Sequence, residues 1–283
     1  MERIFIALRS IGINVHDVAS SVRGVRGTPL TRYARDTAAL HSAIDRWREA
    51  GAEHFVVRLG PADIRTRVTA RLAAMPPAER AHWERVVTSS GADRDSLVFL
   101  AIALDSAGSP IGVANTDPAT ELFLGISEGA TAEAEAAAAE QVLRDVRLFV
   151  RPYPVGLLVD GVGPATANDA FAPPFAWRWF TRDPYHGPRV VWGREVNLFL
   201  LGMANRIAGL PGDPALAPHE SELRSALQKV RSAVQQSGFR SELWSYELRN
   251  GRIVPVRYGT GSDVQLWSTS DLAVAFALSR LGM

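Results

Sequence analysis

The segment Tyr185–Leu201, YHGPRVVWGREVNLFLL, is the stretch from which the fold can be inferred most directly. It opens on a turn at His186-Gly187-Pro188, because a Gly-Pro pair interrupts regular structure. Four apolar residues then recur at spacings of four, three and four, as on one face of a helix. They are Val196, Leu200, Met203 and Ile207. The pattern predicts a turn followed by a helix that begins near Trp192.

Four side chains with chemical functions lie within six residues at the start of this helix. They are Trp192, Arg194, Glu195 and Asn197. An indole face beside a guanidinium, a carboxylate and an amide suits a sugar, which offers an apolar ring face and directional hydroxyl groups. The alternative interpretation is that Trp192 packs in the core and that Arg194 and Glu195 form a solvated ion pair.

The composition excludes several classes of protein. The chain has 283 residues, with 31 Lys and Arg against 30 Asp and Glu, which gives a formal net charge of +1. Such a balance argues against nucleic acid or an acidic membrane surface as a partner. The chain has no Cys, so a disulfide scaffold, a thiolate zinc site and a Cys nucleophile are excluded.

Motifs for metals, cofactors and targeting are also missing from the sequence. The six histidines show no paired spacing such as HxxxH, and there is no GxSxG, P-loop or dinucleotide fingerprint. We therefore expect no metal and no cofactor. The first residues lack the features of a signal peptide, and no run approaches the ~20 apolar residues of a membrane span. We expect a cytoplasmic protein with no membrane partner.

The rest of the chain predicts further helices, with a single β-hairpin near the end. Helical patterns cover 37–49, 61–75, 78–87, 118–124, 131–150, 170–180, 218–236 and 269–281. The last is apolar on nearly every side and is expected to be buried. Asn250-Gly251 is a strong hairpin signal. No boundary divides the chain, so the prediction is a single all-α domain over 1–283 with one late β-hairpin.

Four passages carry a resemblance to a known family, through their order and spacing. They read YPVGLLVDGVGPATANDAF, YHGPRVVWGREVNLFLLGMA, SGFRSELWSYELRNG and DVQLWSTSDLAVAFAL, and LVFLAIALDSAGSPI and ATELFLG precede them. Together, over about 95–283, they resemble the carboxy-terminal part of the six-hairpin α-toroid glycoside hydrolases. This clan includes trehalase, processing α-glucosidase I, the amylo-1,6-glucosidase domain and glucoamylase.

The resemblance implies an (α/α) six-hairpin toroid. Members of the family generally have about twelve helices, and this chain supplies fewer. The toroid is therefore expected to be shortened, to lack an amino-terminal half, or to be completed by another chain. A homo-oligomer is one way of completing it.

The resemblance also implies catalytic residues. Glu242 matches the glutamate that serves as general base, and Glu247 in the same hairpin is a rival. Asp17 is the favoured general acid, and Asp36, in an Arg-Asp-Thr passage, is the second candidate. Inverting hydrolysis needs two such carboxyl groups ~6.5–9.5 Å apart, one protonated and one activating a water.

The expected sugar-binding residues come from the same passages. They are Trp192, Arg194, Asn197, Asp169, His186, Gly187, Trp267 and Asp36, with Pro188 and Trp179 beside them. Asp169 has an alternative interpretation, as a cap for the helix expected over 170–180. Trp179, like Trp177, has the alternative of packing in the core.

Two functions follow as hypotheses. The first is an inverting glycoside hydrolase that acts on an α-linked gluco-oligosaccharide through Glu242 and Asp17. The second is a toroid without the chemistry, which binds carbohydrate or serves as a scaffold, or is a fragment of a larger glycosidase. An epimerase on the same scaffold is a more remote alternative, because it needs paired His bases and only His186 lies on a motif.

Overall fold

The structure is a computed structural model that describes residues 36–46, 53–125, 131–182, 186–259 and 270–282. The chain divides into two compact units, Met1–Phe55 and Val56–Met283. In the first unit, the described residues form α4 (Thr37–Arg46) and a short 3-10 helix (Glu53–Phe55). The single domain expected over 1–283 stays a prediction.

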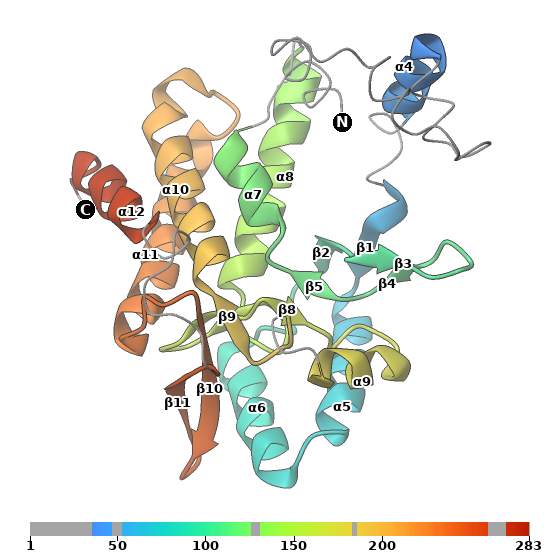
Figure 1. Cartoon of the computed structure of the whole chain (residues 1–283), viewed down its shortest axis with the longest axis vertical. Helices are drawn as coiled ribbons and strands as arrows, with labels where there is room; N and C mark the ends of the chain where they lie inside the picture. The colour runs from blue at the N-terminus through green and yellow to red at the C-terminus, as the bar shows by residue number, and fades with distance from the viewer. Residues whose placement is uncertain (1–35, 47–52, 126–130, 183–185, 260–269, 283) are drawn as a thin grey trace, which may run out of the picture. The chain divides into compact units, whose positions relative to one another are not determined.

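The second unit is mostly helical (Figure 1). Its helices are α5 (Pro61–Ala73), α6 (Pro77–Ser90), α7 (Pro118–Leu124), α8 (Ala132–Val150), α9 (Pro174–Arg182), α10 (Gly193–Gly209), α11 (Glu220–Ser237) and α12 (Ser270–Arg280). Each lies where the sequence predicts a helix, apart from shifts at the ends. The largest shift is in α9, which begins at Pro174 because proline is favoured in the first turn of a helix.

Helix α10 is central to this unit. It packs against α7, α11 and α12, and α11 packs in turn against α8. The four apolar residues that predict α10 are all buried, which confirms the helix and its inner face. Phe199 on α10 stacks on Phe149 of α8 with ring centroids 4.4 Å apart. Gly202 lets α7 come close, because a Cβ there would lie 2.8 Å from the backbone of Leu122.

The prediction of an all-α fold is wrong in one respect, because the second unit contains several small antiparallel sheets. The strands are β1 (Val56–Leu59), β2 (Leu97–Leu100), β3 (Ala103–Leu104), β4 (Pro110–Ile111), β5 (Ala114–Asn115), β6 (Leu158–Val159), β7 (Gly163–Pro164), β8 (Ala167–Asn168), β9 (Val190–Trp192), β10 (Leu243–Arg249) and β11 (Arg252–Arg257). Most have two to four residues, and such short apolar runs cannot be told from helix by periodicity.

The late hairpin is confirmed and is part of a larger sheet. β10 pairs with β11 around Asn250 and Gly251, which both have positive φ angles of 51° and 75°. This backbone is the one that favours Asn-Gly in a two-residue hairpin turn. β10 also pairs with β9, so the order of the sheet is β11-β10-β9. The hairpin is thereby attached to the segment that precedes α10.

The expected burial of the last helix is wrong. In α12, Val274 and Leu278 are buried, but Leu272 and Phe276 are 70% and 65% exposed. Helix α12 packs on α10, and no other described part of the chain covers the Leu272 side. An apolar sequence therefore did not ensure burial, because burial also needs a second surface to pack against.

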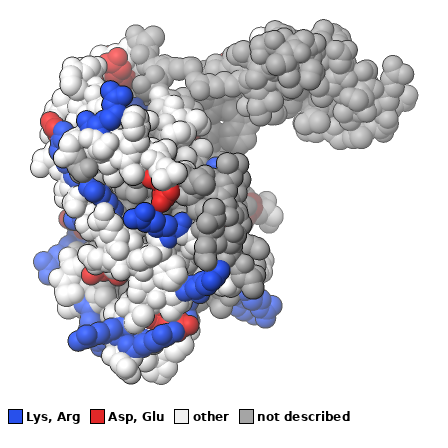
Figure 2. Space-filling model, turned by 60° about the vertical axis from the view of Figure 1, so that its left-hand side comes forward, with Lys and Arg blue, Asp and Glu red and all other residues white. Residues whose placement is uncertain are grey.

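On the face shown in Figure 2, basic side chains cover more of the surface than acidic ones, and they are spread out with acidic side chains among them. Among the described residues, no helix combines the length and the apolar character needed to cross a membrane.

Candidate functional site

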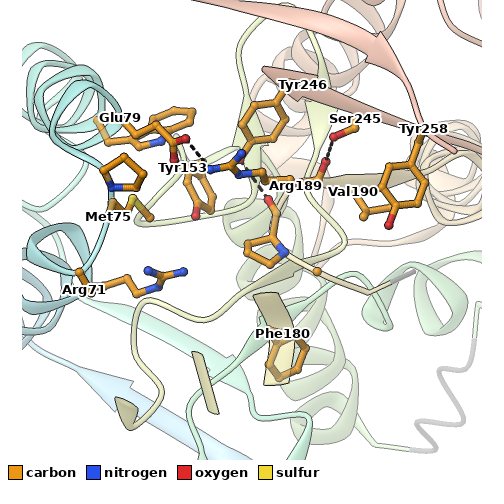
Figure 3. Close-up of a pocket in the computed structure, with 15 residues that line it drawn as sticks. Arg71, Met75, Glu79, Tyr153, Phe180, Arg189, Val190, Ser245, Tyr246 and Tyr258 are labelled. Atoms are coloured by element: carbon orange, nitrogen blue, oxygen red, sulfur yellow. Dashed lines mark hydrogen bonds and ion pairs between the residues drawn. The ribbon is translucent and has the colours of Figure 1, made fainter. Parts of the chain in front are cut away.

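A pocket of about 450 Å³ lies in the second unit, and we call it the Arg71 pocket (Figure 3). Its walls come from α5 and α6, the loop after α8, α9, the start of β9, and β10. The residues labelled in Figure 3 are Arg71, Met75, Glu79, Tyr153, Phe180, Arg189, Val190, Ser245, Tyr246 and Tyr258. A pocket of this size and partly aromatic lining is in the range of small-molecule sites.

One wall of the pocket is Gly187–Val190, which is part of the segment Tyr185–Leu201. Strand β10 holds this stretch in place, because the Tyr246 hydroxyl donates to the carbonyl oxygen of Pro188 at 3.0 Å. The Ser245 hydroxyl donates to the carbonyl oxygen of Arg189 at 2.7 Å. The structure therefore places Gly187 in a pocket wall, and its predicted role in binding stays a prediction.

The Arg71 side chain at the pocket is held from behind by Asp169. Arg71 Nε donates to Asp169 Oδ1 at 2.8 Å, and Nη2 donates to Oδ2 at 3.2 Å. Asp169 is fully buried and Arg71 is 8% exposed. Burial alone would lower the pKa of Arg71, but the hydrogen bonds and charge of Asp169 outweigh it and raise that pKa. Asp169 thus orients a pocket residue and does not itself line the pocket.

The interpretation of Asp169 as a helix cap is wrong. The neighbouring Asn168 accepts the hydrogen bond from the backbone N–H of Ala170, at 3.0 Å, through its own side chain. The first turn of α9 lies further on. The carbonyl oxygen of Asp169 accepts instead from the Trp177 indole at 3.0 Å, and the Trp177 ring lies 5.3 Å from the Arg71 guanidinium. Trp177 therefore supports the ion pair.

A second ion pair lies in the pocket lining. Arg189 Nη2 lies 2.5 Å from both carboxylate oxygens of Glu79, and the two side chains are 51% and 21% exposed. The pair joins α6 to the segment that carries Pro188. With Asp169 behind Arg71, the two cations are matched by two carboxylates, and the site is close to neutral.

The start of α10 brings three predicted binding residues together. The rings of His186 and Trp192 meet edge to face at 5.7 Å, and the Arg194 guanidinium lies 5.7 Å from the Trp192 ring centre. Arg194 also donates to Glu195 Oε1. Glu195 is only 3% exposed, so the interpretation of a solvated Arg–Glu pair is wrong.

Three buried polar atoms near this helix start have no hydrogen-bond partner among the described residues: Glu195 Oε2, Trp192 Nε1 and Thr166 Oγ1. Buried polar groups are almost always paired, so unpaired ones mark a place for a water or a ligand. Burial raises the pKa of Glu195 to about 7, against the lowering effect of Arg194, and the charge of Asp117 raises it further.

The raised pKa of Glu195 predicts how stability depends on pH. Between about pH 4.5 and 7 the folded state holds a proton that the unfolded state has lost, so stability falls as the pH rises. Glu195→Gln removes this contribution, and at pH 8 we expect it to raise the free energy of unfolding by about 1–2 kcal/mol. Urea unfolding of both proteins at pH 5 and pH 8 measures the difference.

Asp145 on α8 provides the control for this experiment. Burial raises its pKa to about 6 even though Arg144 lowers it, so Asp145 adds a slope of the same sign. The contribution of Asp145 remains in Glu195→Gln. The free energy of unfolding of this variant should therefore depend less on pH than that of the unmodified chain, but it should still depend on pH. Equal slopes in the two proteins would show that Glu195 titrates normally.

Glu242 lies next to the start of α10. Its backbone oxygen accepts from the N–H of Gly193 at 2.8 Å, and its side chain is half-buried. The carboxylate of Glu242 has no hydrogen bond or ion pair with the described residues. The rival Glu247 lies on β10 and is exposed, where it pairs with Arg249 at 2.8 Å.

The other predicted residues lie elsewhere. Asn197 donates to the Ser270 hydroxyl at 2.8 Å, which joins α10 to α12. Asp36 belongs to the first unit, where its side chain accepts from the N–H of Ala39 at 3.0 Å and caps α4. Asp17 and Trp267 lie outside the described residues.

Other side chains of the Arg71 pocket are missing from the sequence prediction. They are Arg71, Glu79, Trp83, Tyr153 and Tyr246. Arg71 lies in an ordinary helical pattern, and Asp169, with which it forms the ion pair, is 98 residues away along the chain. Only Tyr153 had a local signal, because it opens a long Gly- and Pro-rich loop, and such loops are often functional.

The fold and the pocket define a mostly α-helical protein with a cavity of small-molecule size. Protein-family models, curated proteins and solved structures contain no match to the chain. Within the described residues, no three His, Cys, Asp or Glu side chains are grouped as metal ligands.

Proposed function

We propose that this protein binds a saccharide in the Arg71 pocket. The observation that carries the proposal is the wall formed by Gly187–Val190, because this stretch belongs to the passage that resembles the sugar subsite of the α-toroid glycoside hydrolases. The proposal unites that resemblance with a cavity whose volume suits one or two sugar rings.

The lining of the pocket has the mixture of groups that sugars require. Trp83 meets Tyr153 and Tyr246 edge to face, with ring centroids 4.8 and 6.0 Å apart, and the three rings form one aromatic cluster. Aromatic rings offer apolar faces to the C–H groups of a sugar. The guanidinium of Arg71 and the hydroxyl of Tyr153 add hydrogen-bond donors for its oxygens.

We also propose that the helices of the second unit form a segment of an (α/α) toroid. Helix α10 packs against α7, α11 and α12, and α11 packs in turn against α8. Pairing of an inner row of helices with an outer row is what a segment of an (α/α) toroid would supply. The exposed apolar residues of α12 agree with a ring that another segment or another chain completes.

Occlusion of the pocket tests the binding proposal. Ala74 lies at the C-terminus of α5 and lines the pocket, whereas its exposed neighbour Ala73 does not. Ala74→Trp should weaken the binding of mono- and disaccharides at least about tenfold, because the indole fills space that the sugar needs, and a tenfold loss corresponds to 1.4 kcal/mol. Isothermal titration calorimetry on the full chain measures this.

Ala73→Trp is the matched control and should bind saccharides like the unmodified chain. Equal affinities in both variants would place the sugar outside the Arg71 pocket. If no saccharide binds to the unmodified chain, the proposal is wrong.

Inverting hydrolysis of an α-linked oligosaccharide is the second candidate. It is favoured by two carboxyl groups near the start of α10, the buried Glu195 with its pKa raised to about 7 and Glu242 on the adjoining segment. A protonated acid beside an ionised base is the arrangement that such hydrolysis uses. Glu242 would be the base, and Glu195 joins Asp17 as a candidate acid. This function requires turnover that depends on Glu242.

A further inference from the structure

We infer that the saccharide bound in the Arg71 pocket carries a carboxylate, as a uronic acid does. The inference rests on the proposed function and specifies the class of sugar. It follows from two hydrogen-bond donors that line the same pocket, the Arg71 guanidinium and the Tyr153 hydroxyl (Figure 3).

Arg71 has a nitrogen that the protein leaves unused. Asp169 occupies Nε and Nη2, and Nη1 has no hydrogen bond to any described residue. The side chain is 8% exposed and held by a bidentate pair, so Nη1 cannot swing out to bulk water. Because Arg71 lines the pocket, a ligand there can supply the acceptor for Nη1.

Tyr153 supplies the second donor. Its side chain is 2% exposed, and its hydroxyl has no hydrogen bond in the described part of the chain. Burial and the charge of Asp169 raise the pKa of Tyr153, so the hydroxyl keeps its proton and can donate it. Trp83 packs edge to face on the ring, which holds the hydroxyl toward Arg71.

The acceptors near these donors are already in use. Asp169 lies behind Arg71, away from the cavity lining, and Glu79 directs both oxygens at Arg189. A ligand therefore meets donors without a competing free carboxylate among the described lining residues. Hydrogen bonds from a guanidinium to an anionic oxygen are roughly twice as strong as neutral ones, so an anionic group gains most from this position.

The charges favour a carboxylate over a phosphate. The two arginines are balanced by Asp169 and Glu79, so the site has no net positive charge that could offset a dianion. A carboxylate has a single charge and two oxygens, which matches one guanidinium nitrogen and one phenol. A sugar hydroxyl can occupy the same place, but it accepts more weakly.

The test compares three sugars that differ only at C6. D-glucuronate carries a carboxylate, D-glucose a hydroxymethyl group and D-glucose 6-phosphate a phosphate. Calorimetry with the full chain at pH 7.5 should show D-glucuronate binding about tenfold more tightly than D-glucose, which is the difference between a charge-assisted and a neutral hydrogen bond. D-glucose 6-phosphate should bind more weakly than D-glucuronate.

Two variants assign the preference to the two donors. Tyr153→Phe removes a hydroxyl that makes no hydrogen bond to the described residues, so the variant should fold normally and lose most of the preference for D-glucuronate. The double variant Arg71→Met, Asp169→Leu removes both members of the ion pair, leaves no buried charge alone, and should abolish the preference.

The outcomes separate the inference from the proposal on which it rests. If D-glucose binds as tightly as D-glucuronate, the inference that the ligand carries a carboxylate is wrong, and the proposal of saccharide binding stands. Tighter binding of D-glucose 6-phosphate would replace the carboxylate with a phosphate. Binding of none of the three would overturn the proposed function together with the inference. A preference that persists in both variants would place the carboxylate away from Arg71 and Tyr153.

Discussion

Asp169→Ala is expected to lower the free energy of unfolding by about 3–5 kcal/mol, the largest effect on stability that we predict. The substitution leaves the Arg71 guanidinium buried without its carboxylate, and desolvation of that cation is no longer offset. It also removes the bidentate contact that holds α5 against the loop before α9. Urea unfolding, followed by tryptophan fluorescence, measures the change.

Two controls distinguish the cost of leaving a buried charge without its partner from the cost of breaking an ion pair of any kind. Arg224→Ala breaks the exposed pair with Glu220 and should cost about 0–1 kcal/mol. The double variant Arg71→Met, Asp169→Leu should recover most of the stability, because apolar pairs of similar volume often replace buried ion pairs at little cost. A double variant as unstable as Asp169→Ala would contradict this account.

Glu242→Gln is expected to lower turnover at least about 10³-fold if the chain hydrolyses α-linked disaccharides, because an amide cannot take the proton from the attacking water. Release of sugar from a panel of α-linked disaccharides and aryl glucosides measures this. Glu247→Gln is the matched control, since Glu247 lies on β10 but is exposed and paired with Arg249. It should leave turnover unchanged.

Glu195→Gln tests, in the same assay, whether Glu195 is the general acid. If Glu195 donates the proton, turnover in the unmodified chain should fall as the pH rises above about 7, and the variant should lose both most of its activity and that limb of the profile. A large loss in Glu247→Gln with none in Glu242→Gln would reverse the assignment of the base. Absence of turnover on every substrate would leave saccharide binding as the function to be tested.

The helices of this protein could be predicted from the sequence because their signals are local. Periodic apolar residues gave α10 its inner face, and Thr131 caps α8 by accepting from the N–H of Ala134. Gly238 ends α11 with a φ angle of 72°, as a glycine there predicts. The short strands were missed, because a run such as Leu97–Leu100 carries no period that separates strand from helix.

The candidate site was predictable only in part. The turn at Gly187 and the cluster of Trp192 with Arg194 come from one continuous segment. The structure places Gly187 in the Arg71 pocket, and it brings Trp192 close to His186 and Arg194, which are not among the residues that line this pocket. Asp169 was expected beside a sugar, but the structure places it behind Arg71.

The sequence by itself determined the helices, the Asn-Gly hairpin and the chemical character of the segment before α10, since each depends on residues that are neighbours along the chain. Only the tertiary structure decided that Arg71, Tyr153 and the Gly187–Val190 wall share one pocket. It also decided that Glu195 is buried and that the Leu272 side of α12 is not. Contacts across 98 residues, such as Arg71 with Asp169, form through packing, and packing leaves no periodic trace in the sequence.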